Sequence, residues 1–326
     1  MPVCSIRKLS IILIVFLASC SVPSPKDTDL IRADNLQSRT LPADKLPIGI
    51  VLDSTTDALS WRHLCAFGIP VDRSGTPEEH KSLIQRKGYT LKHHHQRKTA
   101  FFVCEAPTVK DVHGSLTGRA RWQVDPAICA NNSQCLSGAT DSDYVRSGYD
   151  RGHLAANMNQ RAEVGLKEQT FYLSNAAPQV GAGFNRTVWA DLERDLTVLV
   201  CHAEKMWTIT GPLYVDSRDL QGTGRFETIG AGRVWVPSHF FKLVVWLKDN
   251  KLNGFVIAMP NQRYESDDTY RNYVVSLDWL ESAAQLDLLP ELGDAEELNF
   301  ENNFLSLPEV SWSECDDLCG DVGRCN

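Results

Sequence analysis

The sequence has no excess of basic residues. Its 33 Lys and Arg residues stand against 41 Asp and Glu residues, and the formal net charge at pH 7 is −8. Proteins whose whole surface binds polyanions usually carry the opposite sign, because their cations replace the counterions of phosphates. The charge therefore argues against such a surface and leaves a locally basic cleft as the alternative.

Long hydrophobic runs are also missing. The apolar run at residues 11–17 is too short to span a bilayer comfortably, and no later segment is long and apolar enough. Because basic residues precede the run and small residues follow it, we predict a signal peptide over residues 1–19. Residues 17–20 resemble a bacterial lipobox, which predicts lipidation of Cys20 and an exported, membrane-anchored protein, periplasmic or at the cell surface. The alternative is an ordinary cleaved signal and a secreted protein.

Paired CxxC motifs are absent, although the chain has 10 cysteines. Two of them, Cys4 and Cys20, belong to the export segment. An even number remains, which in an exported chain predicts disulfides. Cys129 and Cys135 flank a short polar loop, where a local pair is expected, and three cysteines could staple the tail. A zinc site is the weaker alternative, because no histidine lies near the tail cysteines. The eight remaining cysteines are Cys65, Cys104, Cys129, Cys135, Cys201, Cys315, Cys319 and Cys325.

No internal repeat is visible, and composition divides the chain into four parts. After the signal peptide, residues 20–45 are rich in Pro, Ser, Asp and Lys, which predicts a flexible tether. Residues 46–298 carry the apolar patterning of one folded domain, which is long enough to bury a large core. Residues 299–326 form an acidic, cysteine-containing tail.

Strand and helix patterns are mixed without regular alternation, so we predict an α+β fold. Runs of β-branched and aromatic residues predict strands, with turn chemistry at Gly211-Pro212 and Asp249-Asn250. Apolar residues at helical spacing predict two helices, the second ended by Pro290. The predicted strands are residues 99–104, 207–215, 233–246 and 252–259, and the predicted helices are residues 185–205 and 276–286.

The segment Asp150-Arg151-Gly152-His153 combines a base with a fixed cation. On an extended strand, Arg151 and His153 point to the same side. Phosphodiester cleavage needs both groups, because a base activates water and positive charge stabilises the transition state. Histidine, with an unperturbed pKa near 6.5, is basic at physiological pH. The alternative is a structural histidine beside an Arg151–Asp150 ion pair.

A second segment opens the first predicted helix. Asn185 lies at its start, and Glu193 follows about two turns later. An amide oxygen is a suitable ligand for Mg²⁺, which keeps most of its waters and takes few protein ligands. The alternatives are that Asn185 caps the helix and that Glu193 is a solvated helix residue.

Together these segments resemble the DNA/RNA non-specific endonuclease family, and within it the endonuclease G branch. The resemblance covers roughly residues 60–290 and begins at the DRGH motif. Further matching blocks are residues 88–89, 121–126, 171–175, 177–179, 210–214, 236–242 and 259–261, together with Asn159 and the Asn185, Trp189, Glu193 spacing.

The resemblance implies the ββα-metal (His-Me finger) nuclease fold, with a central, mainly antiparallel sheet flanked by helices. It also implies a hydrolase that uses Mg²⁺, with Mn²⁺ as an alternative ion. Such an enzyme cuts DNA and RNA with little sequence preference and leaves 5′-phosphate ends. Homodimers, which are common in the family, are a further expectation.

The family's site residues map onto six positions. His153 takes a proton from water, Asn185 is the direct metal ligand, and Glu193 holds a metal-bound water. The other three are Arg151 and Arg121, which neutralise phosphate charge, and Asn175, which orients the site.

One departure concerns a phosphate contact. The family often has an arginine one turn after the glutamate, where this chain has Thr197, and Arg194 points to another helix face. A catalytically impaired, nucleic-acid-binding surface lipoprotein is therefore the alternative function. A structural surface lipoprotein is a third hypothesis, suggested by the tether and tail.

Two further histidine features have structural explanations. Residues 93–95 are three consecutive histidines, for which we predict an exposed hairpin rather than a metal or nucleic-acid contact. His202 closes the first predicted helix, where pairing with the helix C-terminus is expected.

Overall fold

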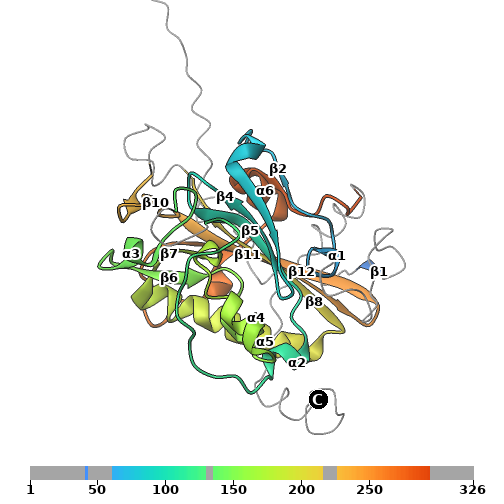
Figure 1. Ribbon diagram of the computed structural model, residues 1–326. Helices are drawn as coiled ribbons and strands as arrows, with labels where there is room; N and C mark the ends of the chain where they lie inside the picture. Colours follow the sequence, from blue (N-terminus) through green and yellow to red (C-terminus); the bar gives the residue numbers. More distant parts are fainter. Residues whose placement is uncertain (1–40, 43–60, 130–134, 216–225, 294–326) are drawn as a thin grey trace, which may run out of the picture.

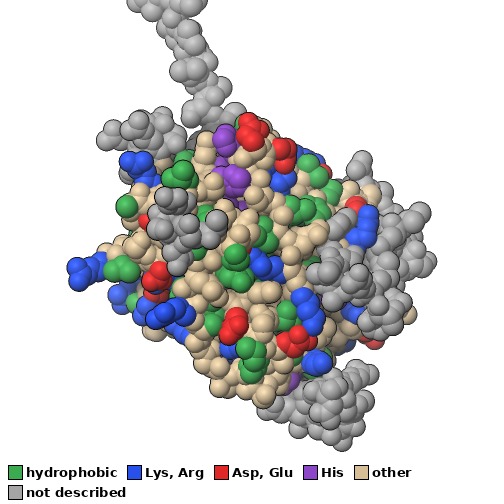
Figure 2. Space-filling model, in the orientation of Figure 1, with side chains coloured by type: hydrophobic (Ala, Val, Ile, Leu, Met, Phe, Trp, Pro, Cys, Tyr) green, Lys and Arg blue, Asp and Glu red, His purple; other side chains and the backbone are tan. Residues whose placement is uncertain are grey.

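The computed structural model describes residues 41–42, 61–129, 135–215 and 226–293 (Figure 1). A large antiparallel sheet crosses this part of the chain, in the order β1-β12-β11-β8-β5-β4-β3, and β13 also pairs with β12. Its strands are β1 (Leu41–Pro42), β3 (Lys81–Gln85), β4 (Thr90–His94), β5 (Thr99–Glu105), β8 (Lys205–Leu213), β11 (His239–Lys248), β12 (Lys251–Pro260) and β13 (Val274–Val275). Figure 2 shows basic and acidic side chains interspersed on one face of the molecule, with no continuous area of either sign.

Shorter elements surround the sheet. The helices are α1 (Trp61–Leu64), α2 (Val109–Val112), α3 (Asp141–Tyr144), α4 (Val164–Gln169), α5 (Val188–His202) and α6 (Leu277–Ala284). The 3-10 and π turns are η3 (Glu78–His80), η4 (Asn157–Asn159), η5 (Leu173–Asn175), η6 (Gly181–Asn185) and η9 (Tyr270–Tyr273). The short strand pairs are β2 (Val71–Asp72) with β14 (Leu286–Asp287), β9 (Thr228–Ile229) with β10 (Val234–Trp235), and β6 (Tyr149–His153) with β7 (Ala176–Val180).

The central hairpin, β11–β12, follows its sequence pattern. Its register runs from His239 opposite Pro260 to Lys248 opposite Lys251. The two-residue turn has positive φ at both positions, 51° at Asp249 and 57° at Asn250. Two-residue hairpin turns favour this conformation, because its twist matches that of the flanking strands. The turn predicted at Asp249-Asn250 is therefore confirmed, whereas the one predicted at Gly211-Pro212 is wrong, because both residues lie within β8.

The predicted strand over residues 233–246 is interrupted. It divides into β10 and β11, and Pro237 lies in the gap. Proline has no amide hydrogen for a ladder, so it separates strands more readily than it continues one. Beyond the gap, the side chain of Asn261 donates to the carbonyl oxygens of Pro237 and Pro178 at 3.0 Å each.

A second unit consists of β6, β7 and α5, which Figure 1 shows grouped on one side of the large sheet. β6 and β7 pair antiparallel, from Tyr149 opposite Val180 to His153 opposite Ala176. The chain then passes through η6 into α5, whose apolar face belongs to the same buried core as the sheet. This strand–strand–helix order confirms the predicted α+β architecture.

Both predicted helices are shorter than expected. α5 begins at Val188, so Asn185 lies before it in η6 and is not its cap. Its Nδ2 instead donates to a carboxylate, as described below. α6 ends at Ala284, and its C-cap Gln285 is left-handed at φ 55°; β14 then follows before Pro290. The prediction that Pro290 ends this helix is therefore wrong, because the left-handed residue ends it five residues earlier.

The histidines at residues 93–95 do not form an exposed hairpin. His93 and His94 are buried in β4, and only the turn after them reaches the surface. His93 Nε2 lies 2.9 Å from the carbonyl oxygen of Ser137, and His94 stacks on Phe101. Burial lowers the pKa of His93 to about 4 and that of His94 to about 3. The prediction failed because β4 is covered on both sides by neighbouring elements.

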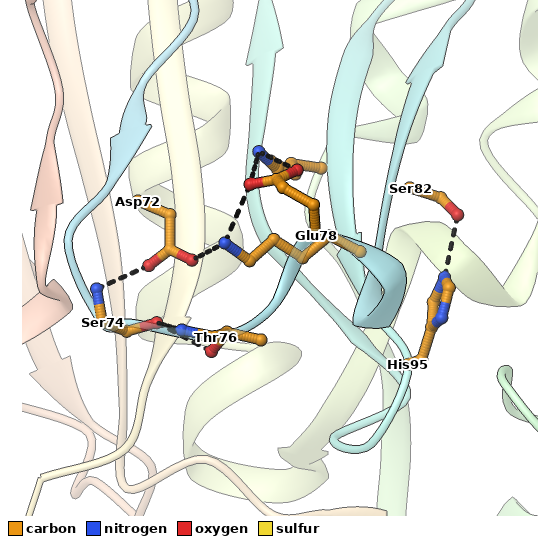
Figure 3. A network of polar contacts seen from close by, with 8 residues as sticks. Asp72, Ser74, Thr76, Glu78, Ser82 and His95 are labelled. Atoms are coloured by element: carbon orange, nitrogen blue, oxygen red, sulfur yellow. Dashed lines mark hydrogen bonds and ion pairs between the residues drawn. The ribbon is translucent and has the colours of Figure 1, made fainter.

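A network of charged side chains lies beside β3, at the edge of the sheet. Lys81 is almost fully buried and lies 2.5 Å from the carboxylate of Asp72 and 3.1 Å from that of Glu78. Figure 3 shows this network together with the 2.8 Å contact between Ser82 Oγ and His95 Nε2. These contacts hold the β2–η3 segment against β3.

Two disulfides join described residues. Cys65 is bonded to Cys104, which ties the segment after α1 to β5, and Cys129 is bonded to Cys135, as predicted. The zinc alternative is therefore wrong for these four cysteines. The predicted signal peptide, Cys20, the tail and most of the predicted tether lie outside the described residues. Leu41–Pro42, within the predicted tether, instead form β1 and pair with β12. Within the described ranges, no helix has the length and apolar character needed to cross a membrane.

Candidate active site

One cavity of about 600 Å³ opens where β6, η6 and α5 meet. It brings together four of the six predicted site residues, Arg151, His153, Asn185 and Glu193. The other two, Asn175 and Arg121, do not line it. The charged and hydrogen-bonding side chains of its wall include Arg119, Asp150, Arg151, His153, Asn157, Asn185, Arg186 and Glu193.

His153 occupies the last position of β6. Its ring lies against two aromatic walls, with centroids 4.6 Å from Trp122 and 4.9 Å from Phe171, the latter perpendicular. Burial, followed by the charges of Arg119 and Lys167, lowers the pKa of His153 to about 3. The imidazole is therefore neutral at physiological pH. Its Nε2 atom is buried and lacks a hydrogen-bond partner among the described residues.

Asn175 holds the backbone that follows His153. Its Oδ1 accepts from the amide of Ala155 at 2.8 Å, and its Nδ2 donates to the carbonyl oxygens of Ala155 and Thr170 at 3.0 and 2.9 Å. The side chain is fully buried. It therefore fixes the position of the histidine strand and does not face the cavity.

Gly152 is required by a close approach inside the strand pair. A Cβ atom at this position would lie 2.1 Å from Oε1 of Gln179, on β7. Gln179 is fully buried and has little room to withdraw. Glycine in the motif therefore allows β6 to lie close enough to β7 to place its neighbours in the cavity wall.

Hydrogen bonds to the carboxylate of Asp150 orient the Asn185 side chain. Its Nδ2 donates to Asp150 at 2.9 Å, and Arg186 Nε donates to the same carboxylate at 2.8 Å. Burial acts to raise the pKa of Asp150, but the hydrogen bonds from Arg186 and Asn185 outweigh it and hold the pKa below its usual value. Because Asp150 is ionised, it fixes the amide nitrogen as donor. The Asn185 Oδ1 atom is then the one available as a ligand.

Arg151 and Asp150 do not form the ion pair that the structural alternative for the motif supposed. Arg151 contacts Asp141 in α3, at 2.6 Å to the carboxylate, and its guanidinium lies 5.1 Å from the Tyr144 ring. Asp150 contacts Arg186 instead. Arg119 is exposed at the cavity wall, whereas Arg121 is exposed elsewhere. The sequence analysis assigned a phosphate contact to Arg121, whereas the structure places Arg119 in the cavity wall.

Glu193 reaches the cavity from α5. Its Oε1 atom is buried and has no hydrogen-bond partner among the described residues. Burial raises the pKa of this carboxyl, while the charge of Lys242 opposes the rise. Lys242, in β11, is buried, donates to Thr210 Oγ1 at 2.8 Å and lies 5.4 Å from the Trp189 ring. Lys242 was not predicted as a site residue, although a single charged residue within an apolar strand could have pointed to it.

A second buried acid supports the segment after His153. Glu105, in β5, accepts from the amide of Ala156 at 3.1 Å and from Asn159 Nδ2 at 3.2 Å. Burial raises its pKa to about 7, against the charge of Lys242. This acid was also missed, because it ends a strand whose other residues are apolar or small.

The donors in the cavity fit a hard divalent cation. The unpartnered Oε1 atom of Glu193 and the fixed amide of Asn185 are both oxygen donors. Mg²⁺ and Mn²⁺ prefer such oxygens to nitrogen or sulfur. Arginines beside them would hold a negatively charged group against the cation.

An antiparallel strand pair that carries a neutral histidine, followed by a turn and a helix with oxygen donors, is the arrangement of the ββα-metal class of nuclease. Residues 68–295 match the family model of the DNA/RNA non-specific endonucleases. The chain belongs to this family. Its members are metal-dependent endonucleases, so the predicted family, fold and type of reaction are confirmed.

Relatives cover most of the described chain. Mitochondrial endonuclease G of Caenorhabditis elegans is 35% identical over 210 residues, which are 63% of this chain and 67% of the relative. Nuclease C1 of Cunninghamella echinulata var. echinulata is 31% identical over 224 residues, which are 67% and 86% of the two chains. A solved structure of an EndoG/EndoGI complex, described as showing the mechanism of EndoG inhibition, aligns with a TM-score of 0.61 and 30% identity. That alignment covers 75% of this chain and 96% of the other.

Proposed function

We propose that the chain is an exported, Mg²⁺-dependent endonuclease that hydrolyses DNA and RNA with little sequence preference, leaving 5′-phosphate and 3′-hydroxyl ends. The observation that carries the proposal is the convergence of a neutral histidine, oxygen donors and arginines on one cavity. Mn²⁺ is the expected substitute ion. The N-terminal pattern favours a lipid on Cys20, and a secreted form is the alternative.

His153 is the general base of this proposal. Because Nε2 is buried, we assign proton transfer to Nδ1, which accepts a proton from the attacking water. The lowered pKa keeps the ring neutral before substrate arrives. A bound phosphodiester adds negative charge beside the ring and raises its pKa, which makes it a stronger base when it is needed. Trp122 and Phe171 keep the ring in one orientation.

Asn185 would hold the cation through Oδ1, and Glu193 would hold one of the cation's waters. When bound, the cation supplies a Lewis acid that stabilises negative charge on the phosphate and the leaving oxygen. Asp150 keeps the Asn185 amide oriented. Glu193 aims an unpartnered buried oxygen at the same cavity.

Arginines neutralise the substrate. Arg119, Arg151 and Arg186 all line the cavity and bring fixed positive charge to a phosphate bound there. Arg121, which does not line it, would contact the backbone of the nucleic acid further along. These local cations explain how a chain with a net charge of −8 binds a polyanion.

The test is digestion of plasmid DNA and of RNA by the full mature chain, with Mg²⁺ and with EDTA. We expect metal-dependent cleavage that disappears in His153→Ala. His80→Ala is the matched control, because His80 lies in η3 and does not line the cavity, and it should cleave normally. Activity that survives in a folded His153→Ala would overturn the assignment of the base.

A catalytically impaired binding protein remains the second candidate. Thr197 replaces the family's arginine, and its Oγ1 donates to the carbonyl of Arg194 at 2.8 Å. Arg194 pairs with Asp191 at 2.6 Å and does not line the cavity. Salt-sensitive binding without cleavage at any Mg²⁺ concentration would favour this candidate. Thr197→Arg would then be the first variant tested for restored cleavage.

A further inference from the structure

A second cavity, of about 490 Å³, lies where α1, α2, the end of α5 and the start of β8 meet. Its wall carries more basic than acidic groups, with Arg62, Lys110 and Lys205 against Glu204. Cys201 also lines it. None of these residues belongs to the candidate active site, which lies nearer the other end of α5.

Cys201 has a covalent partner outside the described residues. It is disulfide-bonded, yet the two disulfides between described residues are Cys65–Cys104 and Cys129–Cys135. Every other cysteine of the described chain is thereby accounted for. Outside it, Cys4 lies in the signal peptide and Cys20 is the expected lipidation site. With Cys4 removed and Cys20 lipidated, as the proposed export implies, the partner comes from the tail, whose cysteines are Cys315, Cys319 and Cys325.

The described chain ends beside the same cavity. Glu291 pairs with Arg62 of the cavity wall at 2.9 Å, and its amide donates to the carbonyl oxygen of Phe67 at 2.9 Å. Roughly 20 residues then precede Cys315, and an extended chain covers up to ~3.3 Å per residue. The tail therefore starts at the rim of the cavity with ample length to reach Cys201.

The charges of the C-terminal tail and of the cavity wall are complementary. Residues 294–326 contain nine acidic residues and one arginine. The cavity wall supplies cations at its rim, and opposite charges attract most strongly where solvent is partly excluded. An oxidising compartment, which the signal peptide predicts, maintains such a disulfide.

We propose that the acidic C-terminal tail docks in this cavity and is locked there by a disulfide between Cys201 and one tail cysteine. The tail is then a covalent strap over the end of α5. It masks a basic patch remote from the active site. Two tail cysteines are left to pair with each other.

The disulfide is tested by tryptic digestion of the oxidised, alkylated full chain followed by mass spectrometry. Trypsin releases residues 195–205, in which Cys201 is the one cysteine, and residues 272–324, which contain Cys315 and Cys319. We expect the first peptide linked to a tail peptide, and cleavage at acidic residues then separates the three tail cysteines. Alkylated Cys201, or a link to any cysteine of the described chain, would overturn the proposal.

Docking in the cavity is tested by hydrogen exchange of the intact, oxidised chain at low salt. In Lys110→Glu/Lys205→Glu, attraction becomes repulsion, and tail amides should exchange roughly tenfold faster. Lys87→Glu is the matched control, because it reverses an exposed charge outside the cavity and should leave tail exchange unchanged. Equal tail exchange in the double variant and the wild type would refute docking at this cavity. Neither experiment depends on nuclease activity, so failure here leaves the proposed function untouched.

Discussion

Replacing Asp150 with alanine should weaken binding of the divalent cation more than binding of DNA. The carboxylate of Asp150 accepts from Asn185 Nδ2 at 2.9 Å and so fixes which end of the amide faces the cavity. Without it, the amide is free to turn, and its oxygen is presented to the cation only part of the time. The effect therefore passes through Asn185, not through a direct contact of Asp150 with substrate.

The expected size follows from the contact that is lost. Removing a residue that orients a metal ligand typically weakens metal binding or activity about 10–100-fold. A hydrogen bond to a charged group contributes about 1.5–3 kcal/mol, which corresponds to a similar range. We therefore expect the half-saturating Mg²⁺ concentration for cleavage to rise about 10–100-fold.

The assay measures initial rates of plasmid cleavage over a wide range of Mg²⁺ concentrations, at fixed ionic strength. Arg186→Ala is the matched control, because it removes the exposed partner of Asp150 but keeps the hydrogen bond to Asn185. That variant should raise KM for DNA with little change in Mg²⁺ dependence. Equal Mg²⁺ dependence in Asp150→Ala and wild type would refute the reasoning. Equal shifts of the Mg²⁺ dependence in Asp150→Ala and Arg186→Ala would attribute the effect to the change in charge rather than to the orientation of the Asn185 amide.

Three further predictions concern pH and packing. Burial lowers the pKa of His153 to about 3, and the general base must be neutral. We therefore expect kcat/KM to fall only as the pH drops well below 6.5. An acid midpoint at or above 6.5 in the pH–rate profile would contradict this. Folding raises the pKa of Glu105 from 4.5 to about 7, so the folded protein keeps a proton that the unfolded chain releases. The free energy of unfolding should then fall by about 3 kcal/mol as pH rises through this interval. In Glu105→Gln, urea titrations should show a flatter dependence of this free energy on pH. An equally steep fall in the variant would rule out Glu105 as the source of the pH dependence. Gly152→Ala should destabilise the fold by about 1–3 kcal/mol, because the added Cβ collides with Gln179. Gly165→Ala is the control, because a Cβ there meets nothing within 4 Å, and it should not destabilise the fold. If thermal unfolding ranked the two variants otherwise, β6 would be able to shift.

Only part of the strand–strand–helix unit was predicted from local patterns. Apolar spacing predicted the amphipathic helix, whereas β6 and β7 were not among the predicted strands, and only three of the five β7 residues are apolar without being proline. The motif residues Arg151 and His153 sit on one strand, so alternation alone places both at the same cavity. Asn185 and Glu193 follow later in the chain, in η6 and α5. The core of the candidate site was therefore available from sequence order.

Errors arose where burial depends on distant neighbours. His93 and His94 lie in a polar stretch, yet β4 pairs on both sides and their rings are enclosed. Lys242 and Glu105 come from strands that sequence patterns describe as apolar, and each is buried because of partners far along the chain. Periodicity reports which face a residue occupies but not what covers that face.

The sequence by itself determined the α+β class and the helix that carries Glu193, because both depend on local propensity and spacing. The candidate site residues came from the resemblance of the DRGH motif and its neighbours to a known family. The tertiary structure decided which partners these residues meet. Asp150 pairs with Asn185 and Arg186, and Arg119 rather than Arg121 reaches the cavity. Such choices depend on distances between elements that only packing of the whole chain fixes. The physical reason is that hydrogen bonds and ion pairs act over a few ångströms, whereas sequence order constrains those distances only within an element.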